Sequence, residues 1–387
     1  MGFPRIHSRT WVLLIVSGLL AIELGLRRGG YGREAVTEFH SELGWIKMPN
    51  QRVQGSSGEG VRINRDGFRD RDWAAPAAAE LPVTEGGQAG LRVAILGDSV
   101  AYAARLPVEQ GMARWLEVAL AKQSPGPVLV QNFATPGWSL EQMVACYSSI
   151  ASRWEPQVVV LVLGSAAIRP ALPVEAGGDY PLRRWIQRTA TWDYLRRRVW
   201  DAGALEGEQR AKKELDGQRA VLEDPFGPAA ETLWSAARDR VAQLAEDVER
   251  GGAKLCVVLV PRMHEIVDRA WDAQVSGGDP LGQRWSALTD VRGHVLSVDL
   301  RPALRRSLRS LLQRVQRAGL EPHLVWGAQR SVEAEGVVLP EETPFQLADP
   351  LHLGERGHRI VAAEIIVGLT RASWLAEKEP PTNKTRE

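Results

Sequence analysis

Residues 92–99 have the sequence RVAILGDS, an apolar run that stops at a glycine, an aspartate and a serine. Four consecutive apolar residues without polar alternation are typical of a strand that is buried on both faces of a parallel sheet. Substrates of open α/β sheets bind beside the carboxyl ends of such strands. Ser99 is therefore a candidate functional residue, although Gly-Asp-Ser is also a common turn tripeptide.

Outside this stretch, strand-like and helix-like patterns alternate along the chain. The alternation predicts an α/β fold in which a parallel, flavodoxin-like sheet carries helices on both faces, giving three layers. Further strands are predicted over 128–134, 158–163, 254–260, 294–300 and 323–326, and helices over 109–122, 140–153, 229–250, 302–317 and 355–369.

The chain has 387 residues, which suits two average domains or one large domain with insertions. Its 48 basic and 47 acidic residues leave no net field that would favour nucleic acid as a partner. The two cysteines, Cys146 and Cys256, form no cluster with histidines, so we expect no structural metal and no cofactor. The sequence leaves open whether they pair or are free buried thiols.

Residues 11–26 are nearly all apolar and are flanked by arginines on both sides. At about 1.5 Å per residue the run spans roughly 24 Å, which is shorter than the roughly 30 Å hydrocarbon core of a bilayer but long for a buried surface helix. We interpret residues 1–30 as an uncleaved signal anchor, with a cleaved signal peptide and a packed helix as the alternatives. The signal-like layout favours a catalytic domain outside the cytoplasm, although the balanced arginines leave the orientation open.

The remaining organisation is predicted from composition and turn signals. An extension over 31–90 contains a small hairpin near 61–63 and an Ala/Pro/Gly-rich linker over 74–90, and the main domain covers 91–375 before a tail over 376–387. A charged, largely helical insertion over 168–228 carries Trp185 and Trp192 near one face. It predicts a helix packed on the domain, or alternatively a lid or a membrane-proximal basic surface.

About 250 residues after Ser99 the chain contains DPLHL at 349–353, followed by Gly357 and His358. With GDSV at 97–100 and NFATPG at 132–137, these blocks resemble the SGNH/GDSL hydrolase superfamily over about 91–369, and the segments 44–50 and 63–70 resemble its membrane-anchored bacterial members. The resemblance implies location at a bacterial cell membrane. It also implies Ser99 as the nucleophile, His352 as the base and Asp349 as the acid.

The chemistry of this set is coherent. Ser99 becomes a nucleophile only when a base takes its proton, and Asp349 lies on the same predicted loop as His352, where it could orient the imidazole. The resemblance also implies that the backbone N–H groups of Ser99 and Gly137 form the oxyanion hole. The third block departs from the family pattern, because Ala166 stands where the family has an asparagine that donates to the oxyanion. Ser165 or a polar group from the insertion could substitute for it.

Other residues near the predicted strand ends receive structural interpretations. We expect Asp98 to brace its turn and His358 to bond backbone groups at a helix start. Arg262 and His264 are interpreted as loop residues in solvent rather than as pocket residues. Asp299 is a rival acid without a histidine at the usual spacing.

The leading hypothesis is a membrane-anchored serine hydrolase that cleaves ester bonds through an acyl-Ser99 intermediate. The alternatives are a polysaccharide O-acyltransferase that uses the same triad and a degenerate, non-catalytic binding protein. The expected partners are an acylated small molecule or glycan and, through the amino-terminal helix, the membrane.

Overall fold

The computed structural model describes residues 8–32, 37–54, 60–72, 90–169, 186, 189–195, 227–262, 266, 280–291, 295–317, 343–346 and 349–375. Most of the predicted linker and insertion, His264, the predicted strand over 323–326 and the tail over 376–387 lie outside these residues.

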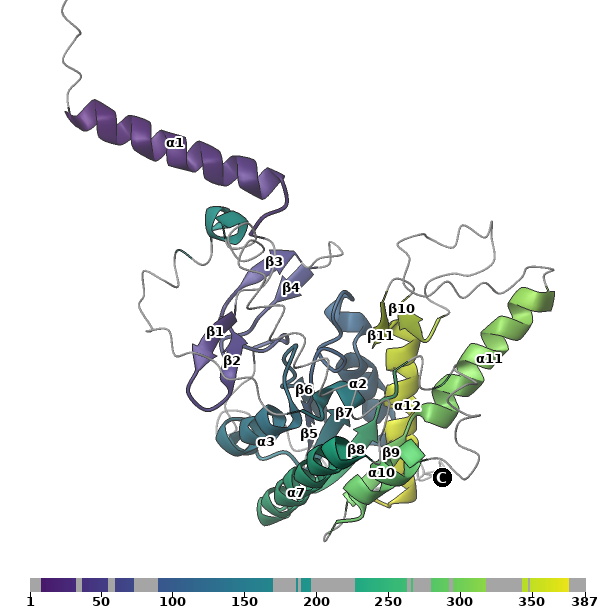
Figure 1. Cartoon of the computed structure of the whole chain (residues 1–387). Helices are drawn as coiled ribbons and strands as arrows, with labels where there is room; N and C mark the ends of the chain where they lie inside the picture. The colour runs from purple at the N-terminus through teal and green to yellow at the C-terminus, as the bar shows by residue number, and fades with distance from the viewer. Residues whose placement is uncertain are drawn as a thin grey trace, which may run out of the picture.

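The core of the fold is a five-stranded, all-parallel sheet with the strand order β6-β5-β7-β8-β9 (Figure 1). This is the flavodoxin-like order, in which the chain leaves the first strand to one side and then crosses to the other. Ligands of such sheets bind where the order reverses, which here is the carboxyl end of β5. The strands are β5 Leu91–Leu96, β6 Val128–Asn132, β7 Val158–Leu163, β8 Lys254–Leu259 and β9 Val295–Asp299, close to the predicted ranges.

Alternate residues of the central strands face two separate hydrophobic layers, so Leu161 packs on one side and Val160 on the other. The Leu161 side is covered by α3 Leu140–Ser149, α7 Pro228–Arg250 and α10 Pro280–Thr289. The Val160 side is covered by α2 Met112–Gln123, α11 Arg301–Arg317 and α12 Glu355–Arg371. The predicted three-layer arrangement is confirmed, and α10 is a helix that the sequence pattern did not reveal.

Two predicted helices are interrupted. Gly111 adopts an extended conformation between the short 3-10 helix η1 Val108–Gln110 and α2, so the predicted helix over 109–122 begins later than expected. The predicted helix over 140–153 likewise ends as α3, and the 3-10 helix η2 Ala151–Trp154 follows. Glu155 then takes a left-handed conformation (φ 49°), which turns the chain into β7.

The prediction that residues 349–353 form a loop is wrong. They form strand β11 (Asp349–Leu353), which pairs antiparallel with β10 (Phe345–Gln346). Pro350 hides this strand from pattern analysis, because proline cannot donate to a strand ladder and is tolerated only at edges. The partner strand is also too short to show a period.

Two further hairpins precede the main sheet. They pair β1 Thr37–His40 with β2 Gly44–Lys47, and β3 Arg52–Gln54 with β4 Gly60–Arg62, so the predicted strand near 61–63 pairs with a strand that precedes it. The first helix, α1 Ser8–Arg28, projects from this end of the molecule (Figure 1). Its apolar side chains are exposed, including Leu13 at 67% and Leu20 at 57%.

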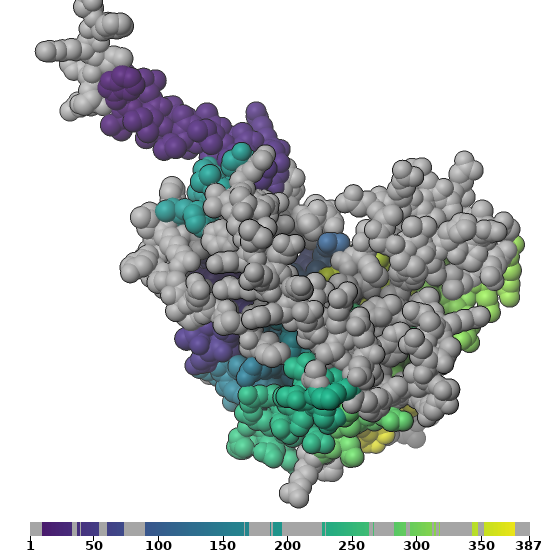
Figure 2. All heavy atoms as spheres, in the orientation of Figure 1, coloured from purple at the N-terminus to yellow at the C-terminus, as the bar shows by residue number. Residues whose placement is uncertain are grey.

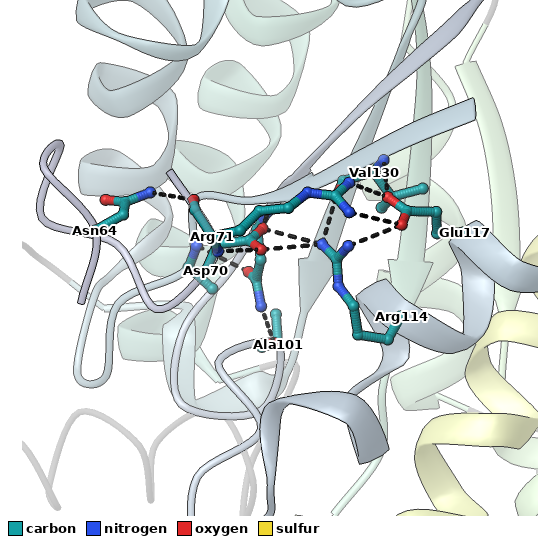
Figure 3. A network of polar contacts seen from close by, with 9 residues as sticks. Asn64, Asp70, Arg71, Ala101, Arg114, Glu117 and Val130 are labelled. Atoms are coloured by element: carbon teal, nitrogen blue, oxygen red, sulfur yellow. Dashed lines mark hydrogen bonds and ion pairs between the residues drawn. The ribbon is translucent and has the colours of Figure 1, made fainter. Parts of the chain in front are cut away.

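A network of charged side chains closes the outer edge of β6 (Figure 3). The carboxylate of Glu117 accepts the Val130 N–H at 2.8 Å, and Arg114 donates to the Val130 carbonyl at 2.6 Å. The carboxylate of Asp70 accepts the Asn132 N–H at 3.0 Å and contacts Arg114 at 3.1 Å. An edge strand exposes unpaired backbone groups, and here side chains satisfy them. The same bonds attach the amino-terminal extension to the sheet.

Arg114 is the shared cation of this network. Its side chain is 16% exposed and that of Asp70 is 3% exposed. Burial raises the pKa of the Asp70 carboxyl, and the Arg114 guanidinium opposes that shift. Because breaking a buried ion pair leaves an uncompensated charge, we expect Arg114→Met to lower the free energy of unfolding by about 3–5 kcal/mol. Urea unfolding of the detergent-solubilised chain measures this loss.

Arg240→Met is the matched control, since Arg240 pairs with Glu141 at 2.9 Å while both side chains are nearly half exposed. We expect it to cost less than about 1 kcal/mol. Adding Asp70→Asn to Arg114→Met should recover part of the loss, because the stranded carboxylate is removed. Equal costs for the Arg114 and Arg240 variants would contradict this account of the edge.

Candidate active site

Ser99 lies on a tight bend directly after β5 and is partly exposed. The bend leaves no room for a side chain at Gly97, where a Cβ would lie 2.5 Å from the Cβ of Ala101. Asp98 is buried, and its carboxylate accepts the Val100 N–H at 2.9 Å. Asp98 was expected to brace the turn through its backbone, and its carbonyl accepts the Tyr102 N–H at 3.0 Å. Its side chain contributes as well.

The electrostatic surroundings of Asp98 connect this bend to three distant segments. Burial raises the pKa of the Asp98 carboxyl, and the Val100 N–H works against that shift. Interactions with His352, Arg169 and Arg262 also lower the pKa of Asp98. These three residues belong to β11 and to the segments that follow β7 and β8.

Arg69 of the amino-terminal extension binds the loop after Ser99. Its buried guanidinium donates to the carbonyls of Tyr102 at 3.2 Å, Ala103 at 2.7 Å and Leu106. It also lies over the Tyr102 ring, 5.1 Å from the centroid. Asn132, in the second sequence block, donates to the Ala101 carbonyl at 2.8 Å. These bonds restrain the segment that carries the serine.

The β10–β11 hairpin is attached to the same loop. Gln346 donates through Nε2 to the carbonyl of Ala104 at 2.8 Å and to that of Leu353 at 3.2 Å. His352 is partly buried in β11, and its Nε2 is shielded from solvent. Asp349 begins the same strand, but its side chain lies outside the described part of the structure.

The loop after β6 runs beside the serine bend, since the Thr135 N–H donates to the Gly97 carbonyl at 3.2 Å. Gly137 is exposed there with φ +80°, a conformation that favours glycine. Trp45 donates through Nε1 to the Pro136 carbonyl at 3.3 Å, and Arg169 donates to the Gly137 carbonyl at 2.5 Å. Both peptide groups that flank Gly137 are therefore fixed by side chains from other segments.

The third block forms a short 3-10 helix, η3 Ser165–Ala167, directly after Gly164. Ser165 is buried, and Ala166 has no polar side-chain atom by its chemistry. Arg169 follows within three residues and lies at the start of the predicted insertion. The polar side chain from this region that contacts the candidate oxyanion loop is thus an arginine rather than an asparagine.

The remaining candidates have structural contacts. Asp299 binds the Arg301 backbone N–H at 2.9 Å and its guanidinium at 2.7 Å, so it braces the start of α11. Cys146 and Cys256 are free and buried, which answers the question that the sequence left open. Arg262 is partly buried rather than a fully exposed loop residue. Within the described ranges no group of three or more His, Cys, Asp or Glu could hold a metal ion.

Sequence reasoning assigned no role to four residues that shape this region, namely Trp45, Arg69, Arg169 and Gln346. Trp45 and Arg69 lie in segments that were noted only for their resemblance to anchored bacterial proteins. That resemblance was the sequence signal available for Trp45 and Arg69, because their hydrogen-bond partners are distant in sequence. Nothing in the pattern around Arg169 or Gln346 marks them.

No protein-family model matches the chain, and no curated protein matches it either. Solved structures of similar fold include one described as TesA, with 14% identity, coverage of 72% of this chain and 98% of that chain, and a TM-score of 0.38. A lipase/acylhydrolase from Enterococcus faecalis has 12% identity, coverage of 75% and 100%, and a TM-score of 0.37. A catalytic mutant of Axe2, an acetylxylan esterase from Geobacillus stearothermophilus, has 12% identity, coverage of 74% and 97%, and a TM-score of 0.39. Likenesses of this degree carry no assignment of activity to this chain.

His358 is fully buried at the start of α12, where Nδ1 accepts the Met112 N–H at 3.3 Å, as its structural interpretation predicted. Burial lowers its pKa to about 3, with His352 and Arg69 adding to the shift. Between this value and the ordinary value of 6.5, the unfolded chain binds a proton that the folded chain does not. Stability therefore falls as the pH falls through this window.

His358→Asn keeps an acceptor for the Met112 N–H but cannot titrate. We expect wild type to lose about 2 kcal/mol more unfolding free energy than the variant between pH 6.5 and about pH 5. Urea unfolding at a series of pH values measures the difference. Parallel pH profiles for the two proteins would contradict a neutral, buried His358.

Proposed function

We propose that this chain is a serine hydrolase of the SGNH/GDSL superfamily that cleaves esters with Ser99 as nucleophile. The observation that carries the proposal is the approach of β11 to the serine bend. His352 acts electrostatically on Asp98, the neighbour of Ser99, and Gln346 ties the same hairpin to the carbonyl of Ala104. We infer from this attachment that His352 and Ser99, from opposite ends of the domain, meet at the carboxyl end of the parallel sheet.

In the proposed reaction, His352 takes the proton of the Ser99 hydroxyl as its oxygen attacks the ester carbonyl carbon. The imidazolium then gives this proton to the leaving alkoxide, and the acyl group remains on Ser99. Water attacks the acyl-serine with His352 again acting as base, which releases the acid and restores the serine. Asp349 is assigned the orientation of the imidazole and the stabilisation of its charge.

The negative oxygen that forms at each step requires hydrogen-bond donors in fixed positions. We assign this role to the backbone N–H groups of Ser99 and Gly137. Trp45 supports the assignment, because it binds the carbonyl of the Pro136–Gly137 peptide whose N–H is the proposed donor. Hydrogen bonds at the two ends of one peptide group polarise each other. Arg169 fixes the next peptide group.

This bracing offers a physical basis for activity without the family's asparagine. Loss of one oxyanion donor typically costs a factor of about 10² to 10³ in rate, so the proposal is a slower enzyme rather than an inactive one. Two restrained backbone donors lose little free energy to reorganisation when the oxyanion forms. The guanidinium of Arg169 adds positive charge beside the Gly137 loop.

We further propose that α1 anchors the enzyme in a bacterial membrane, with the catalytic domain outside the cytoplasm. Residues Thr10–Arg28 form a helix that is long and apolar enough to cross a bilayer, and none of that stretch is buried. A signal sequence has the same length and composition, so this support is limited to the helix itself. The arginines at both ends do not decide the orientation.

A fluorophosphonate probe tests the nucleophile directly. We expect the probe to form an adduct with wild type and none with Ser99→Ala, because only an activated serine attacks phosphorus at a useful rate. His352→Ala should slow labelling strongly, and Asp349→Asn should slow it by a smaller factor. Intact-mass spectrometry measures each adduct.

Ser148→Ala is the matched control, since Ser148 is an exposed serine on α3. It should label like wild type. Equal labelling of wild type and Ser99→Ala would rule out the assignment of the nucleophile. A wild-type protein that does not react with the probe would favour the non-catalytic binding protein. An acyl group that passes from Ser99 to a glycan faster than to water would favour the O-acyltransferase.

Trp45 is proposed as a positioning residue, and Trp45→Phe removes its N–H donor while it keeps a smaller aromatic ring. A net hydrogen bond is worth about 0.5–1.5 kcal/mol, so we expect kcat to fall by about two- to tenfold with KM little changed. Steady-state kinetics on an activated acetate ester measures both constants. A change in KM alone would show that Trp45 contacts substrate rather than the oxyanion loop.

A further inference from the structure

The short helical segment Thr189–Leu195 of the insertion contacts α1 through Glu23. The Glu23 carboxylate accepts the Ala190 N–H at 2.8 Å, the Thr191 N–H at 3.0 Å and the Thr191 hydroxyl at 2.9 Å. The same carboxylate pairs with Arg27 at 2.9 Å, one turn further along α1. A charged residue within an apolar helix is costly in a membrane, and here four contacts compensate for its charge.

A second set of contacts fixes the segment just beyond α1. Asp193 accepts the Gly32 N–H at 2.8 Å, and the rings of Tyr31 and Tyr194 meet edge to face at 5.2 Å. A Cβ at Gly32 would lie 3.0 Å from the Ala190 Cα, so this close approach depends on glycine. The segment therefore contacts α1 itself, through Glu23, and also the residues that directly follow α1. Figure 1 shows the segment beside the end of that helix.

The position of Glu23 along α1 determines how deep residues 189–195 would lie in a membrane that α1 crosses. Glu23 precedes Arg27 by four residues, which is about 6 Å along a helix axis. Arg27 and Arg28 end the apolar span. If α1 crosses a bilayer, Ala190 and Thr191 lie at the boundary between hydrocarbon and headgroups. Tyrosine and tryptophan are enriched at this level in membrane proteins, and Tyr31, Trp192 and Tyr194 are found there.

Two large apolar side chains in this part of the insertion are exposed. Ile186 is 36% exposed and Leu195 is 47% exposed, and outside α1 the other large apolar residues with comparable exposure in the described structure are Val118 and Val367. Figure 2 shows atoms of this segment at the surface directly next to α1. Exposed apolar side chains therefore occur on α1 and on the part of the insertion that contacts it.

We propose that residues 186 and 189–195 contact the lipid bilayer at the headgroup boundary and that Glu23 holds them there. The proposal rests on the membrane-spanning role assigned to α1 above. It makes the membrane a partner of the insertion as well as of the anchor. Two points of contact with the membrane fix the orientation of a domain relative to the membrane plane. A single helix followed by a linker leaves this orientation variable.

The test places a fluorophore on the segment in the full chain. Leu195→Cys is labelled with an environment-sensitive nitrobenzoxadiazole maleimide and reconstituted into vesicles of phosphatidylcholine and phosphatidylglycerol. The native thiols do not interfere near neutral pH, because burial raises the pKa of Cys256 to about 12 and raises that of Cys146 as well. Emission wavelength and quenching by shallow spin-labelled lipids are measured.

Leu20→Cys in α1 is the membrane-inserted reference, and Val118→Cys on α2 is the exposed apolar reference, at 57% and 52% exposure. We expect the Leu195 probe to show blue-shifted emission and strong quenching by shallow lipids, unlike the Val118 probe. A Leu195 probe that matches Val118 while Leu20 is quenched would overturn the proposal. An unquenched Leu20 probe would instead refute the anchor itself, and the proposal with it.

Glu23→Ala tests what holds the segment, with Glu246→Ala as a control on an exposed glutamate of α7. We expect Glu23→Ala to remove most quenching at Leu195 while quenching at Leu20 persists. Glu246→Ala should change neither. Unchanged quenching at Leu195 in Glu23→Ala would refute the role of Glu23.

Discussion

Two consecutive side chains, Arg69 and Asp70, join the amino-terminal extension to the sheet and to the serine loop. The guanidinium binds three carbonyls of the loop that follows Ser99, and the carboxylate closes the edge of β6. Neither group could be buried without these partners, because an unpaired charge in the interior is strongly destabilising. The fold of the site therefore includes the extension, and Trp45, delivered by the same extension, reaches the loop that carries Gly137.

The sheet was predictable because each central strand is a continuous apolar run. β7 coincides with its predicted range, and β5 begins one residue before the strand predicted over 92–96. The first helix was harder, since Gly111 takes an extended conformation that periodicity does not report. The β10–β11 hairpin was missed for a similar reason, because Pro350 and a two-residue partner strand carry no period.

The residues of the candidate site also differ in how far the sequence predicted them. Ser99 was indicated by local pattern, whereas His352 and Gly137 were proposed from resemblance to known blocks. Their bracing residues could not be predicted, because the bond from Trp45 to Pro136 spans 91 residues and that from Gln346 to Ala104 spans 242. Such pairs depend on the completed fold, and a single sequence carries no signal for them.

The proposed function requires that the backbone N–H groups of Ser99 and Gly137 together bind the oxyanion at the carboxyl end of β5. The most direct measurement is a crystal structure of the chain after reaction with a small fluorophosphonate. We expect phosphorus bonded to Ser99 Oγ, with the phosphoryl oxygen within hydrogen-bond distance of the Ser99 and Gly137 backbone nitrogens. Phosphorus on another residue, or a phosphoryl oxygen that points away from the Gly137 loop, would contradict it.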